Sequence, residues 1–238
     1  MTSPGDPPPS RPSSFDEWVE AFREQASFFT GVRLSEGPPR WPLSDVLPVL
    51  PVVGAGVGLA AGLVFAIVRG IAGSGWLAAV LAVGMAILIT RALHEDGLAD
   101  TADGLGPHGL AAERRLEIMR DSRNGTFGVL AIALTVLIKV ACLAQFSGST
   151  GFAVLIAAHA LSRAVIAYPL LAFSPVRPDG LGVQAGKPTD NDVWLAIGLG
   201  VAIALLLLLG KGFFVAILAP AAAAAAGVFS ARWIAQRI

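Results

Sequence analysis

An acidic stretch interrupts the apolar sequence at residues 91–106, which read RALHEDGLADTADGLG. If this stretch is helical, Asp96, Asp100 and Asp103 stand at i, i+4 and i+7 and share one helix face. Three carboxylates at such short distances repel one another unless a cation lies between them. Hard divalent cations such as Mg²⁺ prefer carboxylate oxygens, which they share with substrate phosphates. The spacing predicts a Mg²⁺ site, with a solvated acidic helix end as the alternative.

The residues beside these aspartates are candidates for the same site. Glu95 adds a further carboxylate to the predicted metal ligands, and His94 is a candidate contact for a phosphate-bearing substrate. Gly97 and Gly104 have no side chain and would let a bulky phosphate approach the backbone closely. An EF-hand does not fit, because the Asp and Gly spacing and the closing Glu are wrong for it.

A second charged motif follows at residues 114–128, RRLEIMRDSRNGTFG. Arg120 and Arg123 carry forked donors that suit phosphate oxygens, and Asp121 between them is a further candidate metal ligand. The alternative is that the arginines anchor the chain at the cytoplasmic membrane surface. For Arg114 and Arg115 the two interpretations stay open.

Lys139, His159 and Arg163 lie inside apolar runs, where a charge is costly, so we expect them to face the bundle interior and to have partners. His159 and Arg163 stand one helical turn apart. We expect a polar cavity that runs down from the acidic stretch, with purely structural hydrogen bonding as the alternative. Lys187, in the Gly-rich 174–192 loop, would belong to a basic lid over the same face, or else to a plain connection.

The composition indicates a membrane protein as the scaffold for these residues. Of the 238 residues, 55% are hydrophobic and 14% are charged, and the mean hydropathy is +0.69. The predicted fold is all-α, a polytopic membrane helix bundle of about six transmembrane helices plus an N-terminal amphipathic helix. The six apolar runs are 47–69, 75–93, 127–146, 151–173, 193–210 and 212–233. Frequent Gly and Ala, notably Gly54, Gly56, Gly58 and Gly62, favour close helix packing.

Three regions are expected along the chain. Residues 1–14 are rich in Pro and Ser and are predicted to be a disordered tail with no signal peptide. Residues 15–36 are predicted to form an amphipathic helix at the membrane interface, with packing on the membrane domain as the alternative. Residues 47–238 are predicted to form a single transmembrane catalytic domain. The one cysteine, Cys142, excludes an intrachain disulfide.

The charges predict the orientation. With six spans, thirteen Lys and Arg residues and all seventeen acidic residues fall on the side of the 94–126 loop, whereas the other side holds Arg69 and Lys211. By the positive-inside rule the first side faces the cytoplasm. We therefore expect an integral protein of the bacterial cytoplasmic (inner) membrane, in contact with membrane lipid and with a cytoplasmic active site. A net charge of zero gives no argument for nucleic acid, and a homo-oligomer stays open.

The two motifs HEDGLADTADG and RRLEIMRDSRNGTFG together resemble the signature of the cobalamin-5'-phosphate synthase (adenosylcobinamide-GDP ribazoletransferase) family of integral membrane enzymes. The likeness runs from Phe15 to about Arg237 and includes RPDGLG. It implies Mg²⁺-dependent transfer of the adenosylcobinamide phosphate group from adenosylcobinamide-GDP to α-ribazole or its 5'-phosphate, with release of GMP, in the last steps of vitamin B12 biosynthesis. Family members continue past this point with a Gly- and Asp-containing motif and a final hydrophobic segment, which this chain is expected to lack.

The resemblance assigns roles that fit the residue chemistry. Asp96, Asp100 and Asp103 would hold Mg²⁺ against the diphosphate, so that charge on the leaving GMP is neutralised. Asp103 would accept the hydroxyl proton. Arg120, Arg123 and Lys187 would steady the phosphates or the guanosine side.

Two other functions share parts of this pattern. A CDP-alcohol phosphotransferase would share the aspartates, but its pattern has Ala-Arg shortly after the Asp-Gly, whereas here Ala99 is followed by Asp100. A secondary transporter would place acids at the midplane, often in repeated halves. In this chain the intramembrane charges are basic and the halves do not resemble each other.

Overall fold

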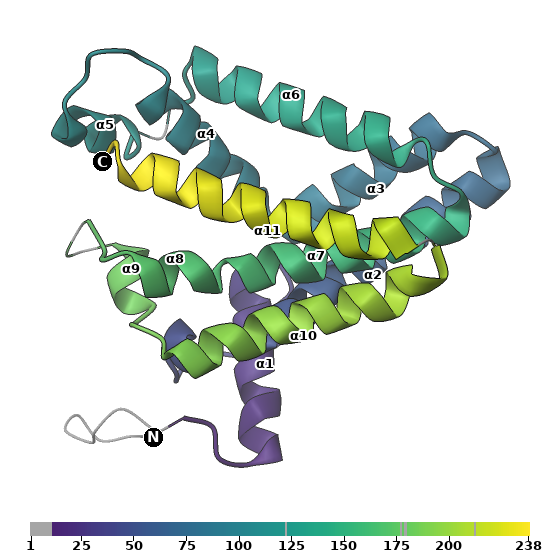
Figure 1. Cartoon of the computed structure of the whole chain (residues 1–238), viewed down its shortest axis with the longest axis horizontal. Coiled ribbons are helices and arrows are strands. Elements are labelled where there is room, and N and C mark those ends of the chain that lie inside the picture. Colours follow the sequence, from purple (N-terminus) through teal and green to yellow (C-terminus); the bar gives the residue numbers. More distant parts are fainter. Residues whose placement is uncertain (1–10, 122, 177, 179, 212) are drawn as a thin grey trace.

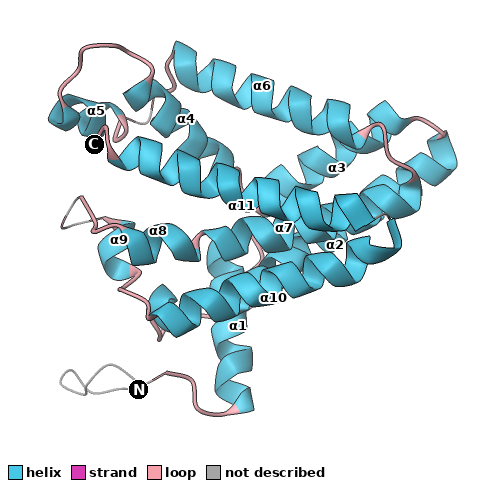
Figure 2. Cartoon of the chain, viewed as in Figure 1, coloured by secondary structure: helices cyan, strands magenta, loops and turns pink. Residues whose placement is uncertain are grey.

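The structure, a computed structural model, describes residues 11–121, 123–176, 178, 180–211 and 213–238; the side chains of 213–220 and 223 lie outside the description. Every regular element within these residues is a helix (Figures 1 and 2). In chain order they are α1 (Phe15–Phe29), η1 (Leu43–Asp45), α2 (Val49–Ala72), α3 (Gly75–Ile89), α4 (Leu93–Leu105), α5 (Ala112–Ile118), α6 (Thr126–Leu143), α7 (Gly148–Val165), α8 (Ala167–Ala172), α9 (Leu181–Gln184), α10 (Asp190–Leu208), η2 (Leu209–Lys211) and α11 (Phe213–Ala235).

Among the described residues, four helical segments are long and apolar enough to cross a membrane. They are α2, α6, the segment Gly148–Ala172 that joins α7 to α8, and the segment Asp190–Lys211 that joins α10 to η2. The pair α3 and α4 also meets this test when taken together, although it is bent by 88°. The predicted span 212–233 overlaps α11. Residue 212 and the side chains of 213–220 and 223 lie outside the described part. The predicted all-helical, polytopic membrane bundle is confirmed.

The predicted span 75–93 is not one straight helix, which corrects the expectation. The chain bends at Arg91 and Ala92, whose φ values are 51° and 56°. Such angles cost a residue with a side chain about 1–2 kcal/mol. Gly31 holds the bend: its N–H donates to the Ile89 carbonyl at 2.6 Å, and its carbonyl accepts from the Arg91 guanidinium at 3.2 Å. Beyond the bend, α4 packs against α6 (Figure 1).

The glycines of α2 serve close packing against α7, as the sequence predicted. A Cβ on Gly54 would overlap the carbonyl of His159, and one on Gly58 would overlap the backbone of Ile156. Gly56 lies on another face of the helix, where a Cβ would meet open space. The two helices form the largest helix contact of the bundle. Small residues four apart therefore bring α2 and α7 into backbone contact.

The N-terminal helix α1 runs across the long helices (Figure 1). Ser14 and Glu17 form a capping box at its start. Ala21, Ala26 and Phe29 pack against the beginnings of α2 and α10. The helix ends at Phe29 rather than near residue 36, because Thr30 turns to an extended conformation with φ −132°.

The segment before α1 is held to the bundle at Arg11. Residues 1–10, most of the predicted disordered tail, lie outside the described residues. Arg11, which was included in that tail, donates to both carboxylate oxygens of Asp192 at 2.7 and 2.5 Å. This ion pair ties the start of the described chain to the first turn of α10.

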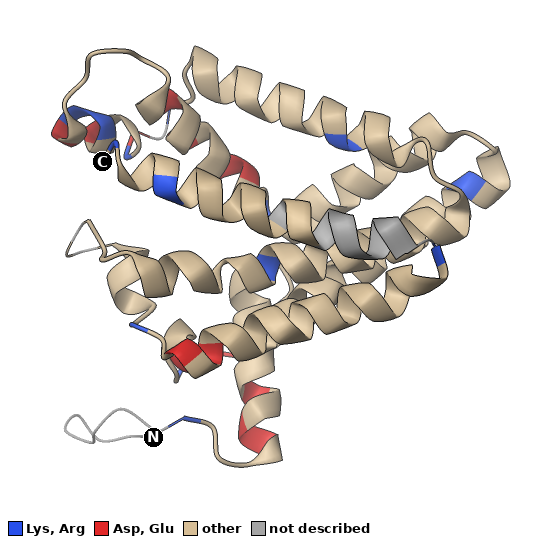
Figure 3. Cartoon of the chain, viewed as in Figure 1, with Lys and Arg blue, Asp and Glu red and all other residues tan. Residues whose placement is uncertain are grey.

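Charged residues are unevenly distributed over the bundle (Figure 3). They gather on α1, α4, α5 and the start of α10, whereas the turns at the opposite ends of the long helices carry few. Arg69 in the last turn of α2 and Lys211 in η2 belong to that opposite side. The fold therefore has one strongly charged end and one end with little charge.

Candidate functional site

The acidic row lies on α4, which confirms the helical interpretation of residues 93–105. Asp96 is exposed, and Asp100 and Asp103 are half-buried. No hydrogen bond or ion pair from another described residue engages the carboxylates of Asp96 or Asp100. These two side chains, one helical turn apart, are therefore available to a cation.

The carboxylate of Asp103 is engaged in the fold. Its Oδ2 accepts a hydrogen bond from the backbone N–H of Gly125 at 2.6 Å, and its Oδ1 accepts one from Gly128 at 2.9 Å. These N–H groups stand at the start of α6, where no helical carbonyl is available to them. A Cβ at either glycine would overlap the Asp103 carboxylate. Asp103 therefore joins α4 to the N-terminus of α6.

Asp121 is held locally by Arg123. The Arg123 Nη2 donates to Asp121 Oδ2 at 2.7 Å, and its Nε donates to Oδ1 at 3.0 Å. These hydrogen bonds lower the pKa of Asp121 to about 2. Both residues lie in the connection between α5 and α6, and Arg120 is exposed just before them.

The structure does not bring the five predicted metal ligands together. Within the described residues, no three His, Cys, Asp or Glu side chains gather closely enough to hold a metal ion. Asp103 caps α6, Asp121 pairs with Arg123, and Glu95 faces Lys139. Asp96 and Asp100 remain as a pair of carboxylates, which fits a Mg²⁺ ion that takes its other ligands from water and substrate phosphates.

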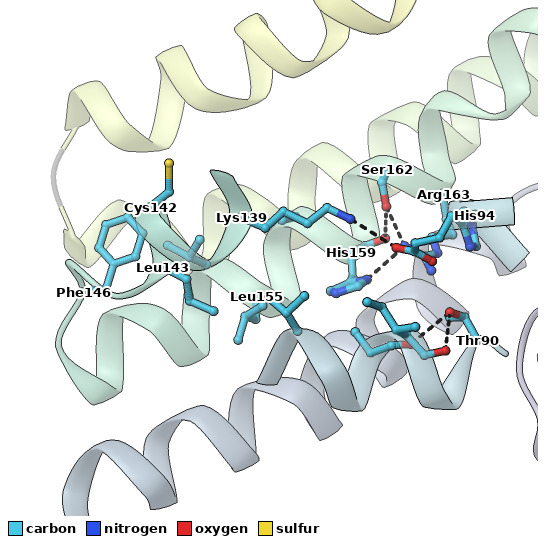
Figure 4. A pocket seen from close by; sticks show the side chains of 16 residues that line it. Thr90, His94, Lys139, Cys142, Leu143, Phe146, Leu155, His159, Ser162 and Arg163 are labelled. Carbon is cyan, nitrogen blue, oxygen red and sulfur yellow. Dashed lines mark hydrogen bonds and ion pairs between the residues drawn. The ribbon is translucent and has the colours of Figure 1, made fainter. Parts of the chain in front are cut away.

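A cavity of about 460 Å³ opens between α3, α4, α6 and α7 (Figure 4). Most of its wall is apolar and includes Val83, Ala86, Leu143, Phe146 and Leu155. Its polar lining is formed by His94, Glu95, Lys139, His159, Ser162 and Arg163. A cavity is thus present at Lys139, His159 and Arg163, but the predicted polar character holds only for one part of its lining.

Arg163 is the most buried charge of this cavity, with 5% of its surface exposed. Its Nη1 donates to His159 Nδ1 at 2.9 Å and to Ser162 Oγ at 2.8 Å. Because a guanidinium only donates, His159 accepts through Nδ1 and keeps its proton on Nε2. Arg163 therefore has partners, as expected of a charge in an apolar run, and they are His159 and Ser162.

Glu95 and Lys139 form the other polar contact of the cavity. Lys139 Nζ donates to Glu95 Oε1 at 3.3 Å, across the gap between α6 and α4. The second oxygen, Glu95 Oε2, is buried without a hydrogen-bond partner in the described part of the chain, and so is Arg163 Nε. His94, on the preceding position of α4, lies against Phe29 of α1 with ring centroids 6.5 Å apart.

The other predicted contacts are spread over the charged end. Gly97 is exposed, with open space where a Cβ would stand. Gly104 is buried against Met119, so packing accounts for it. Lys187 is exposed and follows Gly186, which lies against Ser44 near η1. Arg177 of the predicted lid lies outside the described residues.

Two features of the site went unrecognised in the sequence. Ser162 precedes Arg163 and is an ordinary small polar residue in a helix, so its position alone gave no signal. The link from Asp103 to α6 spans 22 residues along the chain. The only sequence signal for it was Asn-Gly-Thr before an apolar run, which marks a helix start that needs an acceptor from elsewhere.

Comparison with known proteins decides the family. The sequence model for cobalamin-5-phosphate synthase matches residues 21–238, a range that contains α4 and every helix that lines the cavity. The chain belongs to the cobalamin-5-phosphate synthase family. The resemblance of the two acidic and basic motifs to this family is thereby confirmed.

Curated members of the cobalamin-5-phosphate synthase family named adenosylcobinamide-GDP ribazoletransferase are similar to this chain. The protein from Allorhizobium ampelinum is 45% identical over 151 residues, which are 62% of this chain and 58% of that relative. The one from Bradyrhizobium diazoefficiens is 43% identical over 181 residues, 75% of this chain and 69% of the relative. The one from Azorhizobium caulinodans is 42% identical over 149 residues, 61% and 56% of the two chains.

The chain thus spans little more than half the length of the first of these cobalamin-5-phosphate synthase relatives. No solved structure matches the chain.

Proposed function

We propose that the protein transfers the adenosylcobinamide phosphate group from adenosylcobinamide-GDP to the ribose 3'-hydroxyl of α-ribazole or its 5'-phosphate. The ribose oxygen forms a bond to the phosphorus that carries the cobinamide, the bond from that phosphorus to GMP breaks, and the hydroxyl proton is released. The products are GMP and adenosylcobalamin or its 5'-phosphate. This activity would make the protein a transferase of cobalamin biosynthesis.

One structural observation carries the proposal: α4 carries both a pair of free carboxylates and two residues that line a cavity of small-molecule size. Asp96 and Asp100 share one face of α4, and the preceding residues, His94 and Glu95, line the cavity. A phosphoryl transfer needs this juxtaposition, because the diphosphate of one substrate must meet the hydroxyl of the other. The name of the relatives supports the same reaction.

Mg²⁺ is the cofactor that fits the carboxylate pair. Asp96 and Asp100 would hold it, and it would neutralise negative charge on the diphosphate and the leaving GMP. Asp103 is a positioning residue in this proposal, since it fixes α4 against the start of α6. Exposed Arg120, Arg123 and Lys187 lie at the charged end, where they can attract phosphate-bearing substrates.

The proposal places the protein in the bacterial cytoplasmic membrane, with α4 facing the cytoplasm and lipid around the long helices. The distribution of Lys and Arg supports this orientation, because the basic residues gather at the end that carries α4 and α5 (Figure 3). Charged nucleotide substrates are cytoplasmic molecules, so a site at that end is within their reach.

The test uses purified full-length chain in lipid nanodiscs with adenosylcobinamide-GDP, α-ribazole and Mg²⁺. We expect GMP and the corrinoid product to form in equal amounts and to disappear when EDTA is added. Asp100→Asn should lower the rate at least about 100-fold, since a metal ligand is lost. Asp16→Asn, an exposed first-turn acid of α1, is the matched control and should keep the rate. Turnover of a CDP-alcohol with no corrinoid product would overturn the proposal.

A further inference from the structure

Two unsatisfied polar atoms belong to residues that line the same cavity. Three buried side-chain atoms in the described residues have no hydrogen-bond partner: Arg69 Nε, Glu95 Oε2 and Arg163 Nε. The last two belong to residues on the polar side of the cavity between α3, α4, α6 and α7 (Figure 4). An unpaired buried polar group costs about 1–3 kcal/mol. A ligand that satisfies both atoms would recover that cost.

The chemistry of the two atoms restricts the ligand. Glu95 Oε2 belongs to a carboxylate, which accepts hydrogen bonds, whereas Arg163 Nε belongs to a guanidinium, which only donates. A phosphate would suit Arg163 but would be repelled by Glu95. An ammonium group would suit Glu95 but would be repelled by Arg163 and Lys139. A hydroxyl both donates and accepts, so a sugar hydroxyl matches the hydrogen-bonding chemistry of both residues.

The rest of the cavity suits an apolar body. Val83 and Ala86 of α3, Leu143 of α6, Phe146 of the α6–α7 connection and Leu155 of α7 form its wall. Its volume of about 460 Å³ lies within the usual range of small-molecule sites, about 300–1,000 Å³. Guanine would leave its several donors and acceptors unpaired against this wall, at a cost for each. A base with few polar atoms would leave few such groups unpaired.

We infer that this cavity binds the acceptor nucleoside, with its base among the apolar side chains and a ribose hydroxyl between Glu95 and Arg163. The inference rests on the proposed function for the identity of the nucleoside, α-ribazole. It places the acceptor inside the helix bundle and leaves the guanosine diphosphate at the charged end, beside Asp96 and Asp100. The ribose then lies at the first turn of α4, next to the carboxylates assigned to the metal.

A cysteine in the cavity lining allows this binding to be measured by alkylation. Cys142 is the only cysteine, it is exposed, and it lines the cavity. We would measure the rate at which N-ethylmaleimide alkylates Cys142 in nanodiscs, without metal and without the GDP substrate. Saturating α-ribazole should slow alkylation at least about 5-fold, since a bound base covers the thiol. Guanosine at the same concentration should leave the rate unchanged. Equal rates with and without α-ribazole would overturn the inference.

A variant tests the apolar part of the cavity. Ala158, on α7, lines the cavity and is exposed to it, so Ala158→Phe should raise the KM for α-ribazole at least about 10-fold. The KM for adenosylcobinamide-GDP should stay within about 2-fold. Ala202→Phe is the control, because Ala202 is an exposed alanine of another long helix, α10, away from the cavity. If Ala158→Phe fails to fold, the alkylation rate of Cys142 in the native chain still tests whether α-ribazole binds in the cavity.

The sugar contact has its own test. The free base of α-ribazole lacks the ribose and should protect Cys142 at least about 10-fold more weakly than the nucleoside. Equal protection by base and nucleoside would overturn the assignment of the hydroxyl to Glu95 and Arg163.

Failure of this inference is distinguishable from failure of the proposed function. If GMP and corrinoid product form but α-ribazole never protects Cys142, the acceptor binds elsewhere and the proposed function stands. If α-ribazole protects Cys142 while no transfer occurs, the binding site is supported and the proposed function fails.

Discussion

The carboxylate of Asp103 accepts a hydrogen bond from the backbone N–H of Gly128 at 2.9 Å, 25 residues further along the chain. Its other oxygen accepts one from Gly125. An acidic side chain of α4 thus caps α6, whose N-terminal N–H groups and dipole favour a negative charge. This contact sets the distance between the helix that carries the acidic row and the helix that carries Lys139.

Asp103→Asn should lower stability by about 1–2 kcal/mol, because one capping acceptor and the negative charge are lost. Asp100→Asn, on the same helix face, should change stability much less, and its main effect should be the loss of Mg²⁺-dependent turnover. Thermal unfolding in nanodiscs measures the first effect, and GMP release measures the second. An Asp103→Asn protein that melts like the native chain but has no activity would contradict the capping role.

Gly58→Ala should destabilise the bundle by about 1–3 kcal/mol, because its Cβ would overlap the backbone of Ile156. Gly56→Ala, two residues earlier, is the matched control. Its Cβ meets open space, and replacing a helical glycine by alanine is favourable by up to about 1 kcal/mol. Melting temperatures of the two variants should therefore move in opposite directions, and a shared direction would count against backbone contact between α2 and α7.

Ala92 tests the strained bend between α3 and α4. At φ 56° a β-branched residue is strongly disfavoured, so Ala92→Val should destabilise by about 1–2 kcal/mol. Ala92→Gly relieves the strain and should be neutral or stabilising by up to about 1 kcal/mol. Denaturant titration of both variants is the measurement. Equal stabilities of the Val and Gly variants would show that residue 92 is not left-handed.

Glu24 of α1 should make stability depend on pH. Burial raises the pKa of its carboxyl, against the opposing hydrogen bond from the Arg40 backbone N–H at 3.0 Å and the Arg40 guanidinium. A raised folded-state pKa favours folding while the group is protonated, so this contribution is present below the ordinary glutamate pKa and is lost as pH rises through the folded-state pKa.

Glu24→Gln removes the titration and keeps an acceptor. The melting temperature of the native chain, relative to that of Glu24→Gln, should therefore fall as pH rises from about 4 to 7. A difference that stays constant over this range, or that grows in favour of the native chain, would contradict the raised pKa.

The sequence was sufficient for features that depend on local pattern. Apolar runs of near-bilayer length predicted the helices, and the i, i+4, i+7 spacing predicted the acidic face of α4. Glycines in the first apolar run predicted close helix packing, whereas the identity of the partner, α7, came from the structure. His159 and Arg163, one turn apart in an apolar run, predicted a polar cavity, because burying such groups without partners is costly.

Features that depend on distant contacts were beyond the sequence. The bend at Arg91 has no proline and no glycine at the bend itself, and it is held by Gly31, 60 residues earlier. Asp103 looked equivalent to Asp96 and Asp100, and only the position of α6 separates it from them. The pairing of Asp121 with Arg123 is local, but the pairing of Glu95 with Lys139 depends on how α4 and α6 pack, which the sequence does not reveal.

The contact between Gly54 and His159 has a consequence for the cavity. The backbone of His159 rests on α2, while the same residue lines the cavity. Any side chain at position 54 would force α2 and α7 apart, and His159 on α7 belongs to the cavity wall. A glycine outside the cavity lining thus helps to set the position of one cavity wall.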